Sequence, residues 1–166
     1  MNYFFLDASA LVKQYHKEEG TDVFSSLFET LLETDPKRLV ISSIALAETI
    51  AAWYRQGHQD GTPQAVLTTV ADQILEDGLS VSRCHISNSI IVTSIDLIVR
   101  HSINASDALL LQQALMFSRN LSQVDRTLVL VSSDKRFLRA ATSEGLRTLN
   151  PEVILAQDVA AMMAES

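Results

Sequence analysis

The apolar positions of this chain form short continuous runs that alternate with longer helical repeats. Continuous runs at 3–6 and 127–131 are each followed by polar residues, which is typical of strands buried on both faces of a parallel sheet. A short run at 39–42 and a segment at 147–149 predict two further strands, and the alternating segment 79–84 predicts an edge strand.

Helical spacing accounts for most of the remaining chain. The segment 21–33 has two apolar rows at a spacing of four: Val23, Leu27, Leu31 and Phe24, Phe28, Leu32. Glycines set the expected helix ends, with one helix stopping before Gly57 and the next, capped by Thr62, ending near Gly78. The segment 86–101 predicts a helix with these residues on its inner side: Ile90, Ile91, Ile95, Ile98 and Val99.

Strands that alternate with helices predict an α/β fold with a parallel sheet of four to five strands. The chain has 166 residues, of which 47% are hydrophobic and 20% charged, as expected for one globular domain with a full core. No apolar run is long enough to span a bilayer. The single cysteine, Cys84, excludes an internal disulfide and fits a reducing cytoplasm.

Four apolar segments each contain one acidic residue: Asp7, Glu48, Asp107 and Asp134. Lone carboxylates are rarely buried unless they are paired or bind a metal. Asp7 and Asp134 follow predicted strands, and open α/β sheets bind ligands outside the carboxyl ends of their strands. The pattern therefore suggests that the four acids share one site.

Each acid also has a simpler structural explanation. Asp7 and Asp134 could cap helices, and Asp107 could be a first-turn acid favoured by the helix dipole. For Asp107 alone the simpler explanation is favoured, and for Asp134 the two are balanced. Glu48 fits it least, because it lies in mid-helix among apolar residues and no Lys or Arg occurs between residues 38 and 55.

Taken together, the four acids favour a metal site. Clustered carboxylates repel one another, and a divalent cation favours their ionised forms. Oxygen-only ligands suit Mg²⁺ or Mn²⁺, whereas no histidine or cysteine falls in these segments, which argues against zinc. Such sites commonly perform phosphoryl chemistry. A net charge of −7 argues against a general nucleic-acid binder, but only −3 remains once the four acids are set aside.

The four segments, in this order, resemble those of PIN-domain ribonucleases, and most closely the toxins of VapBC-type toxin–antitoxin pairs. The matching stretches are LDASALVK at 6–13, SSIALAE at 42–48, NASDAL at 104–109 and SSDKRFL at 132–138. The resemblance implies a single three-layer α/β/α domain over 1–166, with the first strand central and the strand ending near Ser132 beside it. Two departures are Gln112-Gln113, where the family often has small residues, and Ser132, where it often has Thr.

The resemblance also implies the chemistry. It assigns Asp7, Glu48, Asp107 and Asp134 as the catalytic quartet that holds Mg²⁺ or Mn²⁺. It implies an endoribonuclease that hydrolyses RNA phosphodiester bonds and acts as the toxin of a toxin–antitoxin pair.

Five residues near the acids have expected supporting roles. Ser9 and Ser132 match hydroxyl positions that line such sites, although both could equally be helix caps. Lys13, Lys135 and Arg136 flank the acids in sequence and could contact RNA phosphates, or belong to ordinary solvated helix faces.

The resemblance further implies a homodimer and a small antitoxin partner. An Arg from the partner could enter the acidic site. Apolar residues of the first two helices could form a groove for the partner segment: Leu11, Val12, Tyr15, Phe24 and Phe28. The alternative is that they are core residues, and this alternative is favoured for Phe24 and Phe28. The main alternative is a PIN-like nucleic-acid or protein binding module without activity. The presence of all four acids argues against it. A receiver domain or an aspartyl phosphatase would need a second acid beside Asp7 or at Ser9.

Overall fold

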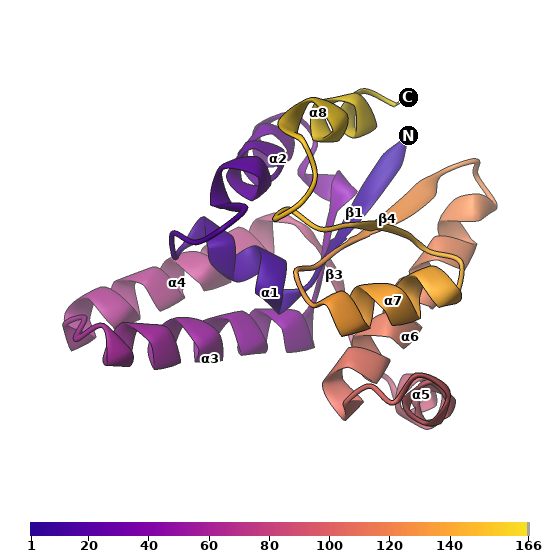
Figure 1. Ribbon diagram of the computed structural model, residues 1–166, viewed down its shortest axis with the longest axis horizontal. Helices are drawn as coiled ribbons and strands as arrows, with labels where there is room; N and C mark the ends of the chain where they lie inside the picture. Colours follow the sequence, from indigo (N-terminus) through magenta and orange to yellow (C-terminus); the bar gives the residue numbers. More distant parts are fainter. Residues whose placement is uncertain (166) are drawn as a thin grey trace.

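A five-stranded, fully parallel sheet in the order β3-β2-β1-β4-β5 forms the centre of the protein (Figure 1). The computed structural model describes residues 1–165, so residue 166 of the expected domain lies outside the described residues. The strands are β1 (Asn2–Leu6), β2 (Leu39–Ser42), β3 (Ser82–Cys84), β4 (Thr127–Val131) and β5 (Arg147–Leu149). The predicted parallel α/β fold is confirmed.

Helices lie on both sides of the sheet and complete a three-layer α/β/α fold (Figure 1). They are α1 (Ala8–Leu11), α2 (Thr21–Thr34), α3 (Ser43–Gln59), α4 (Gln64–Ser80), α5 (Asn88–His101), α6 (Ala105–Ser122), α7 (Lys135–Ser143) and α8 (Ala156–Ala164), with 3-10 turns η1 (Val12–Gln14) and η2 (Pro36–Arg38). Among residues 1–165, no helix has the length and apolar character needed to cross a membrane.

The first strand lies at the centre of the sheet. Its Phe4, Phe5 and Leu6 are fully buried, as a strand covered on both faces requires. Leu6 pairs with Ile41 of β2 on one side and Val131 of β4 on the other. Because all strands are parallel, the residues that follow β1 and β4 meet at one edge of the sheet. The expected central position of the first strand is confirmed.

Two glycines that were expected to end helices lie inside them. Helix α3 continues through Gly57 to Gln59, and α4 continues through Gly78 to Ser80. A Cβ on Gly57 would overlap Cδ2 of Leu67, and one on Gly78 would lie 2.8 Å from Cδ1 of Leu46. The glycines therefore allow α3 and α4 to pack closely, and the predicted helix ends are wrong. The predicted Thr62 cap is also wrong, because Pro63 precedes α4 without a side-chain cap.

The apolar surface of α5 is only partly buried. Ile90 and Leu97 join the core, and Ile98 is partly buried against it. Four other apolar side chains of this helix are exposed by 47–76%: Ile91, Val92, Ile95 and Val99. The predicted inner side is therefore wrong for Ile91, Ile95 and Val99. Their spacing fits an apolar arc of α5 that is wider than the surface its neighbours cover.

The first two helices contribute mainly to the core. Leu11, Phe24 and Phe28 are each only 1% exposed, so these three do not line a groove for a partner. Val12 and Tyr15 are partly buried, and the Tyr15 hydroxyl donates a hydrogen bond to Oδ2 of Asp77 on α4 at 2.7 Å. The expectation that Phe24 and Phe28 are core residues is confirmed.

Candidate active site

The four lone acids line one cavity at the carboxyl edge of the sheet. The cavity has a volume of about 580 Å³, and its walls include Asp7, Glu48, Asp107 and Asp134. These residues come from four segments that are far apart in the sequence. The structure thus brings together every acid that stood out in the sequence.

Helix starts position three of the four carboxylates. Asp7 follows β1 and caps α1, and its backbone N–H donates to the carbonyl of Val131 at 3.0 Å. Asp134 caps α7 by accepting two backbone hydrogen bonds at Oδ1. Asp107 lies in the first turn of α6, where its N–H donates to Oδ1 of Asn104 at 2.8 Å. The simpler structural roles are therefore real, and they place the acids at the cavity.

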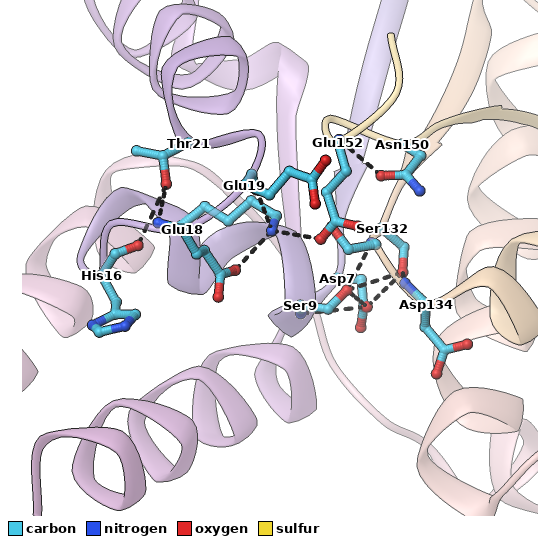
Figure 2. A network of polar contacts seen from close by, with 12 residues as sticks. Asp7, Ser9, His16, Glu18, Glu19, Thr21, Ser132, Asp134, Asn150 and Glu152 are labelled. Carbon is cyan, nitrogen blue, oxygen red and sulfur yellow. Dashed lines mark hydrogen bonds and ion pairs between the residues drawn. The ribbon is translucent and has the colours of Figure 1, made fainter. Parts of the chain in front are cut away.

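Hydroxyl groups hold the Asp7 carboxylate in place (Figure 2). Ser9 and Ser132 donate to Oδ2 of Asp7 at 2.6 and 2.8 Å. The same hydroxyls accept backbone hydrogen bonds from Ser133 at 2.9 Å and Asp134 at 3.0 Å. Ser9 and Ser132 therefore fix one oxygen of Asp7 and tie the segment after β4 to the start of α1.

Glu48 extends the acidic wall from α3. It is half-buried and shares the cavity lining with Ala51, Ala52 and Arg55, which follow it at three, four and seven residues. The small alanines leave space in front of the carboxylate. Its place in the cavity wall accounts for an acidic residue in the middle of a helix, where it cannot act as a helix cap.

The pKa of Asp107 reflects the charges of the other three acids. It is raised to about 6, first by burial and then by the negative charges of Asp7 and Asp134, with a smaller contribution from Glu48. Arg136 opposes the shift. Oδ2 of Asp107 is buried and accepts no hydrogen bond, and Nη2 of Arg136 lies 3.7 Å away, too far for one. Oδ2 of Asp107 is therefore buried without a hydrogen-bond partner.

Lys13 is not available to RNA, so its predicted phosphate contact is wrong. The residue is 1% exposed, and its Nζ donates to Oε1 of Glu18 at 2.7 Å, the carbonyl of Glu19 at 2.8 Å and Oε1 of Glu152 at 2.9 Å. An ammonium group has three donors, so all are used. Figure 2 shows this network beside the hydroxyls that hold Asp7.

The cavity also contains two acids that the sequence did not indicate. Glu18 and Glu152 line it, and both are ion-paired with Lys13. The hydrogen bond from Lys13 lowers the pKa of Glu152 and keeps that side chain ionised. Glu18 lies five residues after Lys13 and offered a local signal, whereas Glu152 is distant in the sequence. Lys135 and Arg136 are exposed at the start of α7, where RNA could reach them.

A PIN domain family model matches residues 4–142 of the chain. The chain belongs to the PIN domain family. This assignment confirms the resemblance seen in the four motif segments. No match was found among curated proteins.

Solved structures share the fold of this PIN domain at low sequence identity. PAE2754 from Pyrobaculum aerophilum is 14% identical with a TM-score of 0.63, and the match covers 96% of each chain. VapBC2 from Rickettsia felis, bound to a promoter DNA fragment, is 17% identical with a TM-score of 0.54, covering 90% of this chain and 98% of the other. A toxin–antitoxin complex from Klebsiella pneumoniae is 17% identical with a TM-score of 0.53 and the same coverage.

The cavity of this PIN domain fits a hard divalent cation in its donor chemistry. Its convergent ligands are carboxylate oxygens, and the buried Oδ2 of Asp107 lacks a hydrogen bond. Within residues 1–165, no three His, Cys, Asp or Glu side chains form a ready-made metal cluster. A shared cation would therefore draw these carboxylates closer together, and its charge would offset their mutual repulsion.

Proposed function

We propose that this PIN domain is a Mg²⁺- or Mn²⁺-dependent endoribonuclease that hydrolyses RNA phosphodiester bonds. PIN domains are in general nucleases. The observation that carries the proposal is the convergence of Asp7, Glu48, Asp107 and Asp134 on one cavity, with Asp107 under the influence of the other three. Such an oxygen-rich site suits phosphoryl chemistry.

In this proposal each residue has a defined task. The four carboxylates would hold the cation, which when bound would supply activation of water and stabilisation of the charge on the phosphate. Ser9 and Ser132 orient Asp7 through its Oδ2. Oδ1 of Asp134 accepts two backbone hydrogen bonds at the start of α7, which leaves its Oδ2 available as a ligand.

The test combines cleavage with a binding measurement. Purified protein is incubated with single-stranded RNA in Mg²⁺, in Mn²⁺ and in excess EDTA, and its melting temperature is measured in each buffer. We expect cleavage only with the cation, together with a higher melting temperature because the cation binds the folded state. Full cleavage in EDTA would contradict the proposal. RNA binding without cleavage in any buffer would instead support the inactive binding module.

We further propose that the protein is the toxin of a toxin–antitoxin pair, acting on RNA in the cytoplasm. Support comes from the fold that it shares with a protein of a toxin–antitoxin complex. An acidic cavity of this kind would also accept an Arg side chain from a small antitoxin, because the guanidinium group forms bidentate contacts with carboxylates.

Co-expression with the neighbouring reading frame tests this partner. A small protein that co-purifies with the chain and suppresses its nuclease activity is the expected result. A neighbouring product that neither binds nor inhibits would contradict the antitoxin proposal and leave the ribonuclease proposal intact.

We also propose a homodimer that uses the exposed apolar side of α5. Ile91, Val92, Ile95 and Val99 lie along one side of the helix, and none of them is charged. A surface of this composition suits a second copy of the same apolar surface better than a charged partner.

A further inference from the structure

A second cavity, of about 270 Å³, lies between the end of α5 and one side of α7. Its lining consists of Arg100, His101, Arg136, Arg139, Ala140 and Ser143, and we call it the arginine cavity. It gathers three of the thirteen Lys and Arg residues of a chain whose net charge is −7. Basic side chains are therefore concentrated here against the overall charge of the protein.

The charge of Arg100 on the α5 wall of the arginine cavity is paired with carboxylates. Arg100 pairs with Glu144 and, at 2.7 Å, with Asp96. Nε2 of His101 lies 2.6 Å from Oε1 of Glu144. These contacts hold the two side chains in position, so they shape the cavity more than they add free positive charge.

The α7 wall supplies the unbalanced charge. Arg136 and Arg139 are exposed, and within residues 1–165 no ion pair involves Arg139. Arg136 makes only the long 3.7 Å contact with Asp107. Ala140 and Ser143 lie on the same side of α7 and are small, which leaves room in front of both guanidinium groups.

The arginine cavity adjoins the acidic cavity along α7. Asp134 at the start of the helix lines the acidic cavity, and Arg139, five residues and about 7.5 Å further along, lines the arginine cavity. Arg136 lies between them, with its guanidinium group beside Asp107. A strand whose phosphate lies at the acids would thus meet these arginines next.

We propose that the arginine cavity binds the backbone phosphates of an RNA strand that flank the bond held at the acidic cavity. The proposal rests on the nuclease function proposed above. Arg guanidinium groups make charge-assisted, often bidentate contacts with phosphate oxygens, and positive grooves commonly follow single-stranded backbones. The lining contains no Phe, Tyr or Trp to stack a base, and the ring of its only other aromatic residue, His101, is held against Glu144. We therefore propose a contact with the backbone phosphates, which do not differ between sequences.

Binding to RNA can be measured separately from cleavage. The Asp7→Asn protein in EDTA is titrated with a short fluorescent single-stranded RNA, and anisotropy gives Kd at several salt concentrations. Adding Arg139→Gln is expected to raise Kd about three- to tenfold and to reduce the slope of log K against log salt by about 0.7, the value for one phosphate contact on a single strand.

A matched control removes the same charge elsewhere. Arg119 is exposed near the end of α6, the end of that helix away from Asp107, and lines neither cavity. The Arg119→Gln change in the same background should leave Kd and slope unchanged. As a second variant, Ser143→Glu keeps all three arginines but adds a negative charge, and it too should weaken RNA binding. Circular dichroism confirms that each variant is folded.

The outcomes separate this inference from the proposed activity. Equal Kd and slope for the Arg139→Gln and Arg119→Gln proteins would overturn the inference, even if the parent chain cleaves RNA. It would equally be overturned if the arginines bound only an acidic protein segment, because RNA affinity would then not change. Conversely, a parent chain that never cleaves RNA but whose binding depends on Arg139 would refute the nuclease proposal and retain the phosphate site.

Discussion

Asp7 serves both the fold and the candidate chemistry. Its backbone extends the contact between β1 and β4, and its side chain caps α1 while Ser9 and Ser132 hold Oδ2. These contacts hold the Asp7 carboxylate in one orientation without a bound ligand, in the way that neighbouring groups commonly orient metal ligands.

We therefore expect Asp7→Asn to abolish cleavage and keep the fold. The amide preserves the shape of the side chain and removes one charge from a repelling group, so the melting temperature in EDTA should be unchanged or higher. Activity should fall by more than about 100-fold, since even residues behind metal ligands typically contribute 10- to 100-fold. Asp72→Asn, at an exposed position of α4, is the control and should retain full activity. An Asp7→Asn protein that cleaves like the parent would refute the site.

The raised pKa of Asp107 predicts a pH dependence of stability in EDTA. Its pKa is about 6 in the folded protein and near 3.8 in the unfolded chain, so the folded state binds the proton more tightly. This residue should thus stabilise the fold as pH falls from about 7 to 4, and that contribution should be lost as pH rises through 6. Comparing urea unfolding of the parent and Asp107→Asn across this range isolates the effect. Identical pH profiles would contradict it.

At the level of residues, the sequence was informative where a charge stood alone. The four acids were found because each interrupts an apolar segment, and burial makes such charges unusual. Lys13 is also a buried charge, but the sequence does not show that it is buried or which acids pair with it. One of the acids that compensates its buried charge, Glu152, lies 139 residues away in the chain, and only the folded structure brings the two together.

At the level of elements, glycine proved ambiguous. In a helical pattern it can end the helix or permit close contact with another helix, and both uses look alike in one sequence. Gly57 and Gly78 take the second role, where α3 and α4 pack against each other. The predicted helices were therefore correct in type and wrong in length.

Gly20 offers a test of such a close approach. Its φ is +80°, and a Cβ there would lie 2.7 Å from the backbone of Pro151. Gly145 has a φ of +85° with no atom within 4 Å of that Cβ position. We expect Gly145→Ala to cost about 1–2 kcal/mol of unfolding free energy from backbone strain, and Gly20→Ala about 1–3 kcal/mol more from overlap.

Urea denaturation of the two variants measures this difference directly. Because Pro151 precedes Glu152, displacement of that segment in Gly20→Ala should also disturb the contact of Glu152 with Lys13. Equal costs for the two variants would show that the approach of Pro151 to Gly20 is not tight.

At the scale of the whole molecule, the exposed side of α5 makes the oligomeric state testable. Val92→Glu places a charge among apolar side chains and should convert the proposed dimer into a monomer, because burying an unpaired charge is costly. Val124→Glu is the matched control, since Val124 is 62% exposed compared with 67% for Val92 and lies outside α5. Light scattering coupled to size-exclusion chromatography reports the mass. A parent that is already monomeric would refute the dimer.

The sequence predicted the arrangement of strands and helices better than it predicted which side chains meet on the surface. Alternating strands and helices, with the family resemblance, gave the parallel sheet and the place of the acids. The arginine cavity could not be found that way, because Arg100 and Arg139 become neighbours only when α5 and α7 are placed side by side. Surface clusters of this kind depend on how elements pack, and periodicity within one element does not report it.

The central position of β1 has a consequence for the order of events during synthesis. Strand β1 is made first, but it pairs with β4, and Asp7 meets Ser132 only after 125 further residues have been added. Contacts this distant in sequence form late and fold slowly. A ribosome-bound fragment that ends before β4 would lack the Ser132 hydroxyl, one of the two that hold Asp7, and the carboxylate of Asp134. Under the nuclease function proposed above, the chain would therefore be inactive until the segment that contains Ser132 and Asp134 has been added.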